Sequence, residues 1–403
     1  MTARRNPRTP GWEPTERPVG PGQAVAAGVL AAVVGWTASF AVVLSGLRAV
    51  GASDAEAASG LLVTSVVMGI GSLVFSWRHR APVTMAWSTP GAALLAGAAL
   101  PGGGYAAAVG AFVVAGLLYV LTALIAPLAE AVQRIPTALA NAMLAGVLLT
   151  LCVEPFRALS ADPAAVAPVL ATWVVALGVA RRWAAPLAFV AALVVIVVTG
   201  SLTAVDAGAL VPQLTWTTPG FSLATAIALG VPLYLVTMTS QNIPGVAVLT
   251  SFGYRTPLRS VLAFAGVTTV ATAGLGGYST NLSAISAGMV AGPVAGPDPD
   301  RRWIGGISMG ITYLVLGVAA NTVAAVATAA PSGVLATVAG VALLGTFAAA
   351  ASAALADGAH RDAAAVAFVV AASGYVLGGV GAAFWSLVAG GIVLVVTRAR
   401  ATT

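Results

Sequence analysis

Long apolar runs dominate this chain of 403 residues and constrain its fold more than any other feature. A bilayer core about 30 Å thick needs roughly 20 apolar residues per helical span, and runs of this kind recur from Gly22 to Val396. Only 7% of the residues are charged, whereas an average soluble domain carries about 25%. The sequence therefore predicts an all-α polytopic membrane protein with about fourteen transmembrane segments.

The predicted segments follow the apolar runs from one polar interruption to the next. We place them at residues 22–47, 54–77, 82–100, 104–127, 135–152, 163–180, 184–204, 220–240, 257–274, 277–292, 303–326, 332–355, 363–378 and 380–397. Residues 1–20 are rich in Pro, Arg and Gly and contain no apolar stretch, so we expect a disordered cytoplasmic tail. The first segment is longer than the 7 to 15 apolar residues of a signal peptide, so we expect it to be retained.

Arginine supplies all 18 basic residues, and its distribution predicts the orientation of the chain. Basic residues near helix ends concentrate on the cytoplasmic side. With the N-terminus inside, every arginine except Arg48 and Arg157 falls on that side. A missed early segment would move the later loops to the wrong side, so both termini are expected to be cytoplasmic.

Several classes of protein are disfavoured by residues that the chain lacks. Cys152 is the only cysteine, which excludes an internal disulfide framework and a cysteine-ligated metal cluster. The chain has no lysine for the phosphate-binding motif of an ATP-driven pump and no His/Glu cluster for a membrane enzyme. We therefore expect no catalytic site, no metal and no cofactor. The arginines sit singly or in pairs, so no nucleic-acid partner is expected, and the lipid bilayer is the main one.

The segments divide into two sets of seven around a polar interruption. Residues 205–219 form the predicted linker between a first repeat at 21–204 and a second at 220–397. An odd number of segments per half inverts the second half relative to the first. Inverted repeats build many secondary transporters, which bind substrate near the midplane where discontinuous helices meet.

Three polar breaks lie at positions that suit such a site. In segment 3, a short extended run precedes Ser88, and Thr89 with Pro90 resembles a helix N-cap and first helical residue. In segment 10, an extended run precedes a helix expected from about Thr280 or Asn281. Segment 8 ends in the polar cluster Ser240-Gln-Asn-Ile-Pro-Gly245, which we expect to break the helix at its proline.

Three longer motifs are the most specific signals in the chain. They are Ala86-Trp-Ser-Thr-Pro-Gly-Ala-Ala-Leu-Leu95, Ile135-Pro-Thr-Ala-Leu-Ala-Asn-Ala-Met-Leu-Ala-Gly-Val-Leu-Leu149 and Ser240-Gln-Asn-Ile-Pro-Gly-Val-Ala-Val-Leu249. They resemble those of the benzoate/proton symporter (BenE) family, over roughly residues 20 to 397. The resemblance implies a bacterial inner-membrane protein that takes up benzoate or a related aromatic carboxylate together with protons.

The chain is also similar, more distantly, to nucleobase and sulfate transporters. That resemblance implies short strands and half-helices in segments 3 and 10. It further implies a core domain of segments 1–4 and 8–11 and a gate domain of segments 5–7 and 12–14, with substrate between them. Nucleobase carriers place carboxylates in segments 8 and 10, whereas this chain has Gln241, Asn242 and Asn281 there. All 12 acidic residues lie in tails, loops or segment ends, which suits an anionic substrate.

We therefore expect the substrate carboxylate to lie between two helix N-termini, where backbone N–H groups and helix dipoles attract an anion. The residues expected to bind substrate are Ser88, Thr89, Pro90, Gly91, Gln241, Asn242, Thr280, Asn281 and Ser283. Four aromatic residues are candidates for lining the ring slot, although membrane aromatics more often pack or anchor: Trp36, Phe40, Tyr234 and Tyr278.

Proton coupling has no obvious carrier in the sequence. Glu130, Glu154 and Asp206 are the nearest candidates, each at a helix end, and the substrate carboxylate is an alternative carrier. A carrier or channel for another small anion, such as sulfate, bicarbonate or an aliphatic carboxylate, is the second interpretation of the same residues. The oligomeric state stays open, with a homodimer as one option.

Overall fold

The computed structural model describes residues 22–125, 127, 136–201, 211–377 and 381–401. The predicted tail at 1–20, the first part of the predicted linker at 205–210, and the candidate proton carriers Glu130 and Asp206 lie outside the described residues.

Helices make up almost all of the described chain, with two short strands between them. The elements are α1 (Gly22–Thr37), α2 (Phe40–Ala49), α3 (Asp54–His79), β1 (Met85–Trp87), α4 (Thr89–Ala96), α5 (Gly104–Leu124), α7 (Thr137–Ala161), α8 (Pro163–Val179), α9 (Ala184–Val198), α10 (Leu223–Thr225), α11 (Val231–Thr237), α12 (Ile243–Ser251), α13 (Leu258–Thr272), β2 (Thr280–Leu282), α14 (Ile285–Ala291), α15 (Trp303–Val318), α16 (Ala320–Thr328), α17 (Val334–Ala356), α18 (Arg361–Ala372) and α19 (Ala382–Ala401).

Within the described residues, 8 helices are long and apolar enough to cross a membrane, or up to 9 when a bent pair of helices is taken as one span. The chain is therefore an all-α polytopic membrane protein, as predicted. Other apolar helices, such as α8 and the half-helices α4 and α14, are shorter. The number of fourteen segments accordingly stays a prediction.

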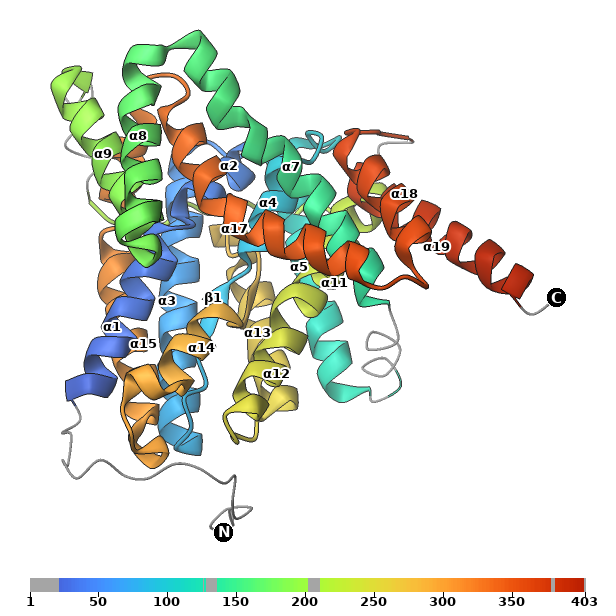
Figure 1. The fold of residues 1–403 in the computed structure, drawn as a ribbon, viewed down its shortest axis with the longest axis horizontal. Helices are drawn as coiled ribbons and strands as arrows, with labels where there is room; N and C mark the ends of the chain where they lie inside the picture. Colours follow the sequence, from blue (N-terminus) through green and yellow to red (C-terminus); the bar gives the residue numbers. More distant parts are fainter. Residues whose placement is uncertain (1–21, 126, 128–135, 202–210, 378–380, 402–403) are drawn as a thin grey trace.

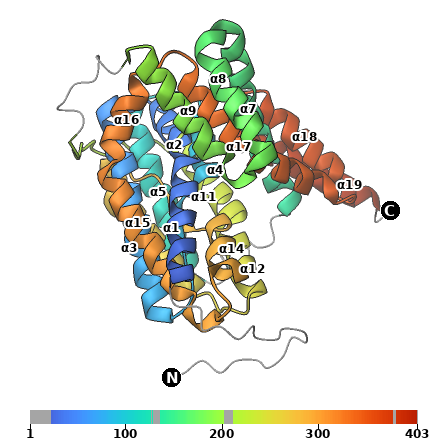
Figure 2. The same cartoon turned by 60° about the vertical axis from the view of Figure 1, so that its left-hand side comes forward.

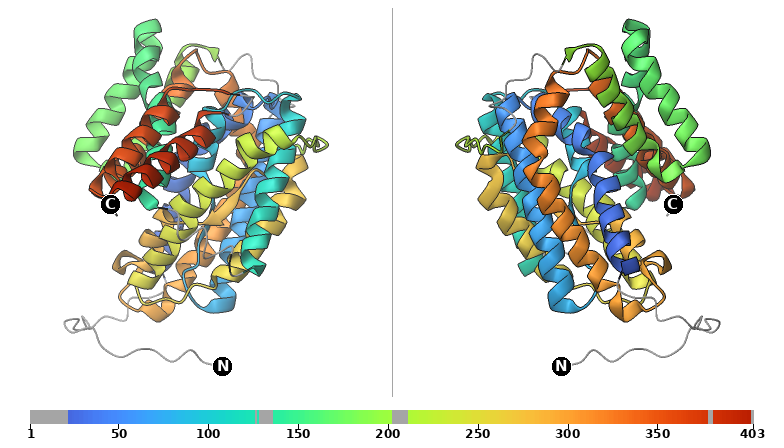
Figure 3. Two further views of the ribbon diagram at one scale, coloured as in Figure 1. Left: turned by 90° about the vertical axis from the view of Figure 1, so that its right-hand side faces the viewer. Right: turned by 90° about the vertical axis from the view of Figure 1, so that its left-hand side faces the viewer.

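Helices from the two halves of the sequence pack against each other in pairs. The most extensive contacts join α3 to α15, α5 to α13 and α7 to α17. The α3–α15 and α5–α13 pairs stand side by side in one upright bundle, while α7, α17, α18 and α19 lie together obliquely across it (Figures 1 and 2). Figure 3 shows α8 and α9 as a separate hairpin at the edge of this second group.

Glycines set the distance between paired helices in the upright bundle. A Cβ atom on Gly310 of α15 would lie 2.6 Å from the carbonyl oxygen of Gly69 on α3. A Cβ atom on Gly266 of α13 would likewise lie 2.6 Å from the carbonyl oxygen of Gly116 on α5. Small residues let helix backbones approach closely in lipid, where helix association depends on packing rather than on the hydrophobic effect.

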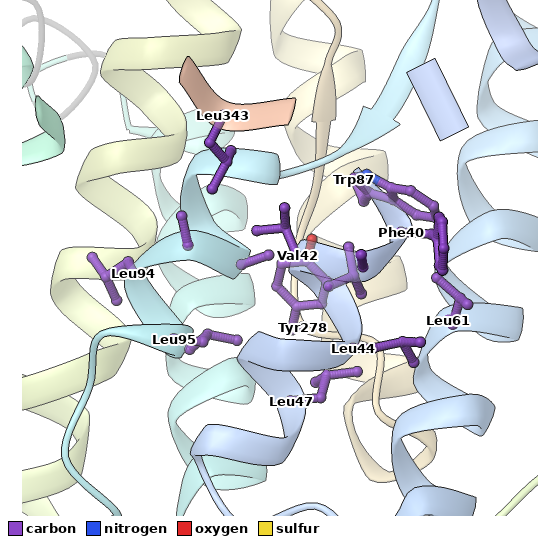
Figure 4. Packing of buried hydrophobic residues seen from close by; sticks show 14 of the residues in the cluster. Phe40, Val42, Leu44, Leu47, Leu61, Trp87, Leu94, Leu95, Tyr278 and Leu343 are labelled. Carbon is purple, nitrogen blue, oxygen red and sulfur yellow. The ribbon is translucent and has the colours of Figure 1, made fainter. Parts of the chain in front are cut away.

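Buried side chains of several helices converge on the centre of the bundle. Figure 4 shows Tyr278 surrounded by aliphatic residues of α2, α3 and α4, with Leu343 of α17 and the pair Phe40 and Trp87 nearby. This packing fixes α2 and α4 around the region where the two strands meet.

The structure differs from the prediction at three points along the helical segments: two segments contain a break or bend that was not predicted, and one predicted break is absent. The segment predicted at 22–47 is interrupted between α1 and α2, because the Ser39 hydroxyl donates to the Gly35 carbonyl at 2.7 Å and occupies a main-chain acceptor. The segment predicted at 303–326 is bent by 50° between α15 and α16. Conversely, the predicted proline break at 244 is wrong, since helical structure continues to Ser251.

A π turn just before Pro244 allows the helix to continue through this proline, and a second π turn lies just before Pro232. They span Ala226–Gly230 and Met238–Asn242, on either side of α11. Proline lacks the N–H that an α-helical turn requires, and a π turn widens the helix locally and changes which carbonyls need a donor. Gln241 and Asn242 consequently lie inside a helical span rather than at its end.

Arginines cap the carboxyl ends of two helices. Arg259 donates from Nε to the Ala123 carbonyl at the end of α5, at 2.9 Å. Arg302, only 7% exposed, donates from Nη1 to the Ala291 carbonyl at the end of α14, at 2.7 Å, and from Nε to the Gly296 carbonyl at 2.9 Å. A cation at a helix carboxyl end is stabilised by the helix dipole and by unpaired carbonyls.

Replacing Arg302 by Met should destabilise the protein by about 2 kcal/mol or more, because two buried charge-assisted hydrogen bonds are lost while the aliphatic stem is retained. The apparent melting temperature of the detergent-purified protein is the measurement. Arg301→Met is the matched control, since Arg301 is 60% exposed and pairs loosely with Asp298 at 3.6 Å. Equal melting temperatures for the two variants would contradict the capping role of Arg302.

Candidate functional site

The candidate site is built around the crossing of β1 and β2. The strands pair antiparallel, with Met85 opposite Leu282, Ala86 opposite Asn281 and Trp87 opposite Thr280. Two further backbone bonds extend the pairing: the Ser88 N–H donates to the Ser279 carbonyl at 3.2 Å, and the Ser283 N–H donates to the Thr84 carbonyl at 2.9 Å. The extended run predicted before Ser88 is thus confirmed as a strand.

A short helix leads away from each strand. Ser88, not Thr89, is the N-cap of α4: its hydroxyl accepts the Gly91 N–H at 3.0 Å, and Pro90 is the second helical residue. The expected helix start at Thr280 or Asn281 is also wrong, because both residues belong to β2 and α14 begins at Ile285. Strand pairing takes up Thr280 to Leu282, so the helix can begin only after Ser283.

Ser283 has the same local role beside α14 as Ser88 has beside α4. Its hydroxyl accepts the Ser286 N–H at 3.1 Å. The Gln241 Oε1 atom accepts the Ala284 N–H at 3.4 Å. The carboxamides of segment 8 therefore meet the backbone of segment 10, which is the partnership that adjacent buried amides require.

Asn242 supports the strand crossing from behind. It is fully buried, its Oδ1 atom accepts the Leu282 N–H at 3.0 Å, and its Nδ2 atom donates to the Met238 sulfur at 3.5 Å. Leu282 faces Met85 in a non-hydrogen-bonded pair of the strand ladder, so this bond satisfies a main-chain N–H that points away from β1. Asn281, also buried, donates from Nδ2 to the neighbouring Leu282 carbonyl at 2.9 Å.

A cavity of about 140 Å³ lies beside the crossing. Its described lining comes from both halves of the chain: Ala31, Val34, Gly35, Ala38, Ser39, Met68, Ala86, Trp87, Thr89, Pro90, Gln241, Ser283, Ile285, Ser286, Met289, Tyr313, Ala342, Leu343 and Thr346. None of these side chains is charged. Ile285 is 68% exposed, so the cavity opens to the outside next to the start of α14.

The predicted substrate residues fall into two groups in the structure. Thr89, Pro90, Gln241 and Ser283 line the cavity. Ser88, Gly91, Asn242, Thr280 and Asn281 lie behind that lining, in the hydrogen-bonded framework of the crossing. The structure thus brings all nine together around one point and separates those that face the cavity from those that hold its walls.

The four aromatic candidates lie outside the lining. Trp36 stacks on Phe40 with ring centroids 5.2 Å apart and donates from Nε1 to the Ser65 hydroxyl. Tyr278 donates to the Ser88 carbonyl at 2.9 Å, and Tyr234 pairs with Thr122. All four residues are buried in packing contacts.

Trp87 and Tyr313 are the aromatic residues that do line the cavity. The Trp87 ring lies 5.9 Å from that of Trp36, and its Nε1 atom donates to the Ser39 hydroxyl at 2.9 Å. Neither Trp87 nor Tyr313 was among the residues predicted to line the cavity. Trp87 carries a signal, since it directly precedes the helix cap at Ser88, whereas Tyr313 lies on a distant segment and only tertiary packing brings it to the site.

The described residues that line the cavity include no Asp, Glu, His or Arg. Glu154 on α7 pairs with Arg157 at 2.6 Å in an exposed contact. Among the described residues there is no group of three or more His, Cys, Asp or Glu side chains arranged to hold a metal ion. The chemistry available at the cavity is therefore hydrogen bonding and apolar contact.

Solved transporters share this arrangement of helices. The fold is similar to the transmembrane domain of a cyanobacterium bicarbonate transporter, BicA, with a TM-score of 0.59 and 17% identity, over 91% of this chain and 96% of that one. It is also similar to the murine Solute Carrier 26 family member A9 anion transporter in its inward-facing state, with a TM-score of 0.63 and 10% identity, over 96% of this chain and 70% of that one. The chain is thus a multi-pass membrane protein with the fold of these two proteins.

The chain belongs to the benzoate membrane transport protein (BenE) family, whose model matches residues 20–396. It is 36% identical over 370 residues to the inner membrane protein YdcO of Escherichia coli, covering 92% of this chain and 94% of the relative. It is 27% identical over 367 residues to the benzoate membrane transport protein of Acinetobacter baylyi, covering 91% and 93%. The protein is accordingly a transporter and not an enzyme.

Replacing Asn242 by Leu should destabilise the protein by about 1–3 kcal/mol, because the buried Leu282 N–H loses its acceptor. The apparent melting temperature in detergent is the measurement. Asn141→Leu on α7 is the matched control, since that amide donates only to the Thr137 carbonyl of its own helix in an exposed contact. If the Asn242 and Asn141 variants melt together, Asn242 does not support the crossing.

Proposed function

We propose that this protein is a secondary active transporter that imports benzoate or a related aromatic carboxylate together with protons. The observation that carries the proposal is the cavity at the strand crossing, which has a polar end and an apolar remainder. Its volume of about 140 Å³ is close to that of an engineered protein cavity of about 150 Å³ that binds benzene. A cavity of this size suits a single aromatic ring.

The carboxylate would lie at the polar end, between the starts of α4 and α14. The first N–H groups of a helix lack partners within the helix, and the helix dipole makes this end positive. In α4, the Ser88 hydroxyl already accepts the Gly91 N–H, and Pro90 has no N–H. The backbone N–H and the hydroxyl of Thr89 are therefore the donors proposed for the carboxylate. Ser283 accepts from Ser286 and keeps its own proton to donate.

Direct substrate contacts are therefore assigned to Thr89, Gln241 and Ser283. The Gln241 Oε1 atom accepts the Ala284 N–H, so the Nε2 group of the same amide is proposed to donate to the substrate. Pro90 contributes surface. The remaining residues of the predicted set act by holding the strands and half-helices in place: Ser88, Gly91, Asn242, Thr280 and Asn281.

The aromatic ring would occupy the apolar part of the cavity. Trp87, Met68, Met289 and Leu343 supply large apolar surfaces there. Methionine and tryptophan both make favourable contacts with aromatic rings. The absence of charge from the described lining avoids repulsion of the anion and leaves recognition to hydrogen-bond donors.

Alternating access is proposed to occur between a core and a gate. The fourteen segments would form two inverted repeats of seven, with a core of segments 1–4 and 8–11 and a gate of segments 5–7 and 12–14. Segments packed pairwise across the two halves support this division. Phe40 of α2 meets Phe189 of α9 edge to face, with centroids 4.6 Å apart, so this contact would close one side of the site. The arginine caps at the ends of α5 and α14 support a cytoplasmic location for those ends and for both termini.

Proton coupling belongs to the same proposal. No side chain in the described lining titrates in the physiological range, and Glu154 is engaged in an exposed ion pair. The substrate carboxylate itself is therefore the simplest proton carrier.

A carrier or channel for another small anion is the second candidate. The likeness to the fold of a bicarbonate transporter supports it, as does a polar end that would also receive an inorganic or aliphatic anion. An aromatic substrate is favoured because a small inorganic anion would leave the apolar surfaces of Trp87 and Leu343 without a partner.

Proteoliposomes containing the purified protein should accumulate radiolabelled benzoate when an inward proton gradient is imposed, and a protonophore should abolish the accumulation. Protein-free liposomes correct for passive entry of the neutral acid. Gradient-independent equilibration of benzoate would replace the symport claim with a channel. Uptake of bicarbonate or sulfate without benzoate would favour the second candidate.

Thr89→Val should lower the affinity for benzoate about 10- to 100-fold, because a hydrogen bond to a charged group contributes about 1.5–3 kcal/mol. Binding of labelled benzoate to the detergent-purified protein is the measurement. Thr172→Val is the matched control, since Thr172 is half-buried on α8, does not line the cavity and bonds only to the Pro168 carbonyl. Unchanged affinity in the Thr89 variant would remove α4 from the carboxylate site.

A further inference from the structure

We infer that Gly35 creates the room for the substrate ring and thereby sets the ring size that this transporter accepts. The inference rests on the proposed function and goes beyond it by naming a residue that determines selectivity. Two corresponding places in the molecule differ: the Thr237 side chain fills one, and the other, at Gly35, is open.

Two tyrosines mark the corresponding places. Tyr119 ends the sequence Gly116-Leu-Leu-Tyr119 on α5, and Tyr313 ends Gly310-Ile-Thr-Tyr313 on α15. The glycine of each sequence packs against the backbone of a partner helix, α13 for Gly116 and α3 for Gly310. The two tyrosines therefore occupy equivalent positions in the two halves.

The helices that face these tyrosines also correspond. A Cβ atom on Gly28 of α1 would lie 2.0 Å from the Gly305 carbonyl oxygen on α15, and one on Gly230, directly before α11, would lie 2.9 Å from the Ala111 carbonyl oxygen on α5. Ala111 precedes Tyr119 by the same number of residues as Gly305 precedes Tyr313. Gly28 and Gly230 are thus equivalent contact points.

Gly35 and Thr237 follow these two contact points by the same number of residues. Both intervening stretches are α-helical, so the two residues face the same direction relative to their contact points. Gly35 and Thr237 accordingly correspond, although one has no side chain and the other has a branched one.

Thr237 fills its place completely. It is fully buried, and its hydroxyl lies 2.6 Å from the Ser88 hydroxyl at the cap of α4 and beside that of Tyr119. The Thr237 side chain therefore fills the space between the cap of α4 and Tyr119 on this side of the strand crossing.

Gly35 leaves the corresponding place open, and the cavity lies there. A Cβ atom on Gly35 would lie 3.4 Å from the Tyr313 hydroxyl oxygen and 3.6 Å from that of Ser286, with no other heavy atom within 4 Å. Gly35, Ser286 and Tyr313 all line the cavity. A methyl group at Gly35 is in ordinary van der Waals contact with these two hydroxyls, and a larger side chain would reduce the volume of the cavity that Gly35 lines.

The test is a comparison of two aromatic carboxylates in Gly35 variants. Equilibrium binding of benzoate and of 2-furoate, whose ring is smaller, is measured on the full-length detergent-purified protein, for the wild type, Gly35→Ala and Gly35→Thr. Benzoate affinity should fall about tenfold in Gly35→Ala, because one methyl group in an apolar pocket changes affinity by that order. The loss should reach about 100-fold in Gly35→Thr, while 2-furoate loses less, so that the preference shifts toward the smaller ring.

Gly345→Thr on α17 is the matched control, since a Cβ atom there has no heavy atom within 4 Å and Gly345 does not line the cavity. It should bind benzoate like the wild type. If Gly35→Thr does not fold, as judged by size-exclusion chromatography, Gly35→Ala alone carries the test.

Three results would overturn the inference. Wild-type affinity for benzoate in both Gly35 variants would mean that the ring does not lie beside Gly35. An equal loss for both carboxylates in Gly35→Ala would assign Gly35 a structural role without selectivity. If the wild type itself fails to bind benzoate, the proposed function is wrong and the inference falls with it, which distinguishes this failure from the first two.

Discussion

The antiparallel pairing of β1 with β2 is the interaction on which the arrangement of the site depends. Strands of three residues are marginal on their own, and inside a bilayer every exposed backbone group lacks water as a partner. Here the strands satisfy each other, backbone bonds at Ser88 and Ser283 extend the pairing, and Asn242 takes the N–H of Leu282. Because each strand leads directly into a half-helix, the same pairing brings the starts of α4 and α14 to one place.

This arrangement provides a polar site without a fixed charge. Burial of an unpaired charged side chain in the apolar interior is strongly unfavourable, whereas helix ends offer N–H groups and a partial positive potential that belong to the backbone. The carboxyl end of α14 is balanced separately by Arg302, which binds the carbonyls of Ala291 and Gly296. The cation therefore stabilises the half-helix from its far end and leaves the cavity lining uncharged.

Close packing keeps these short elements in position. Gly310 meets the α3 backbone and Gly266 meets the α5 backbone so closely that a side chain would not fit between the two halves of the chain. In the inferred correspondence of the halves, Gly35 stands where Thr237 stands on the other side of the crossing. The cavity lies beside Gly35, the residue without a side chain.

The class of fold follows from the amino-acid sequence alone, because apolar runs of span length and a low content of charge leave few alternatives to a polytopic helical protein. The sequence also located the strand before Ser88 and brought together Thr89, Pro90, Gln241 and Ser283 as candidates, since polar groups and prolines within apolar segments must serve a local purpose. The start of α14 and the continuation of the helix through Pro244 could not be predicted without the packed structure. The same holds for the aromatic residues: Trp87 and Tyr313 line the cavity. The predicted ring-slot residues pack outside it instead: Trp36, Phe40, Tyr234 and Tyr278. The physical reason is that local signals specify which residues need a partner, whereas strand pairing, π turns and contacts between distant helices determine which partner each one finds.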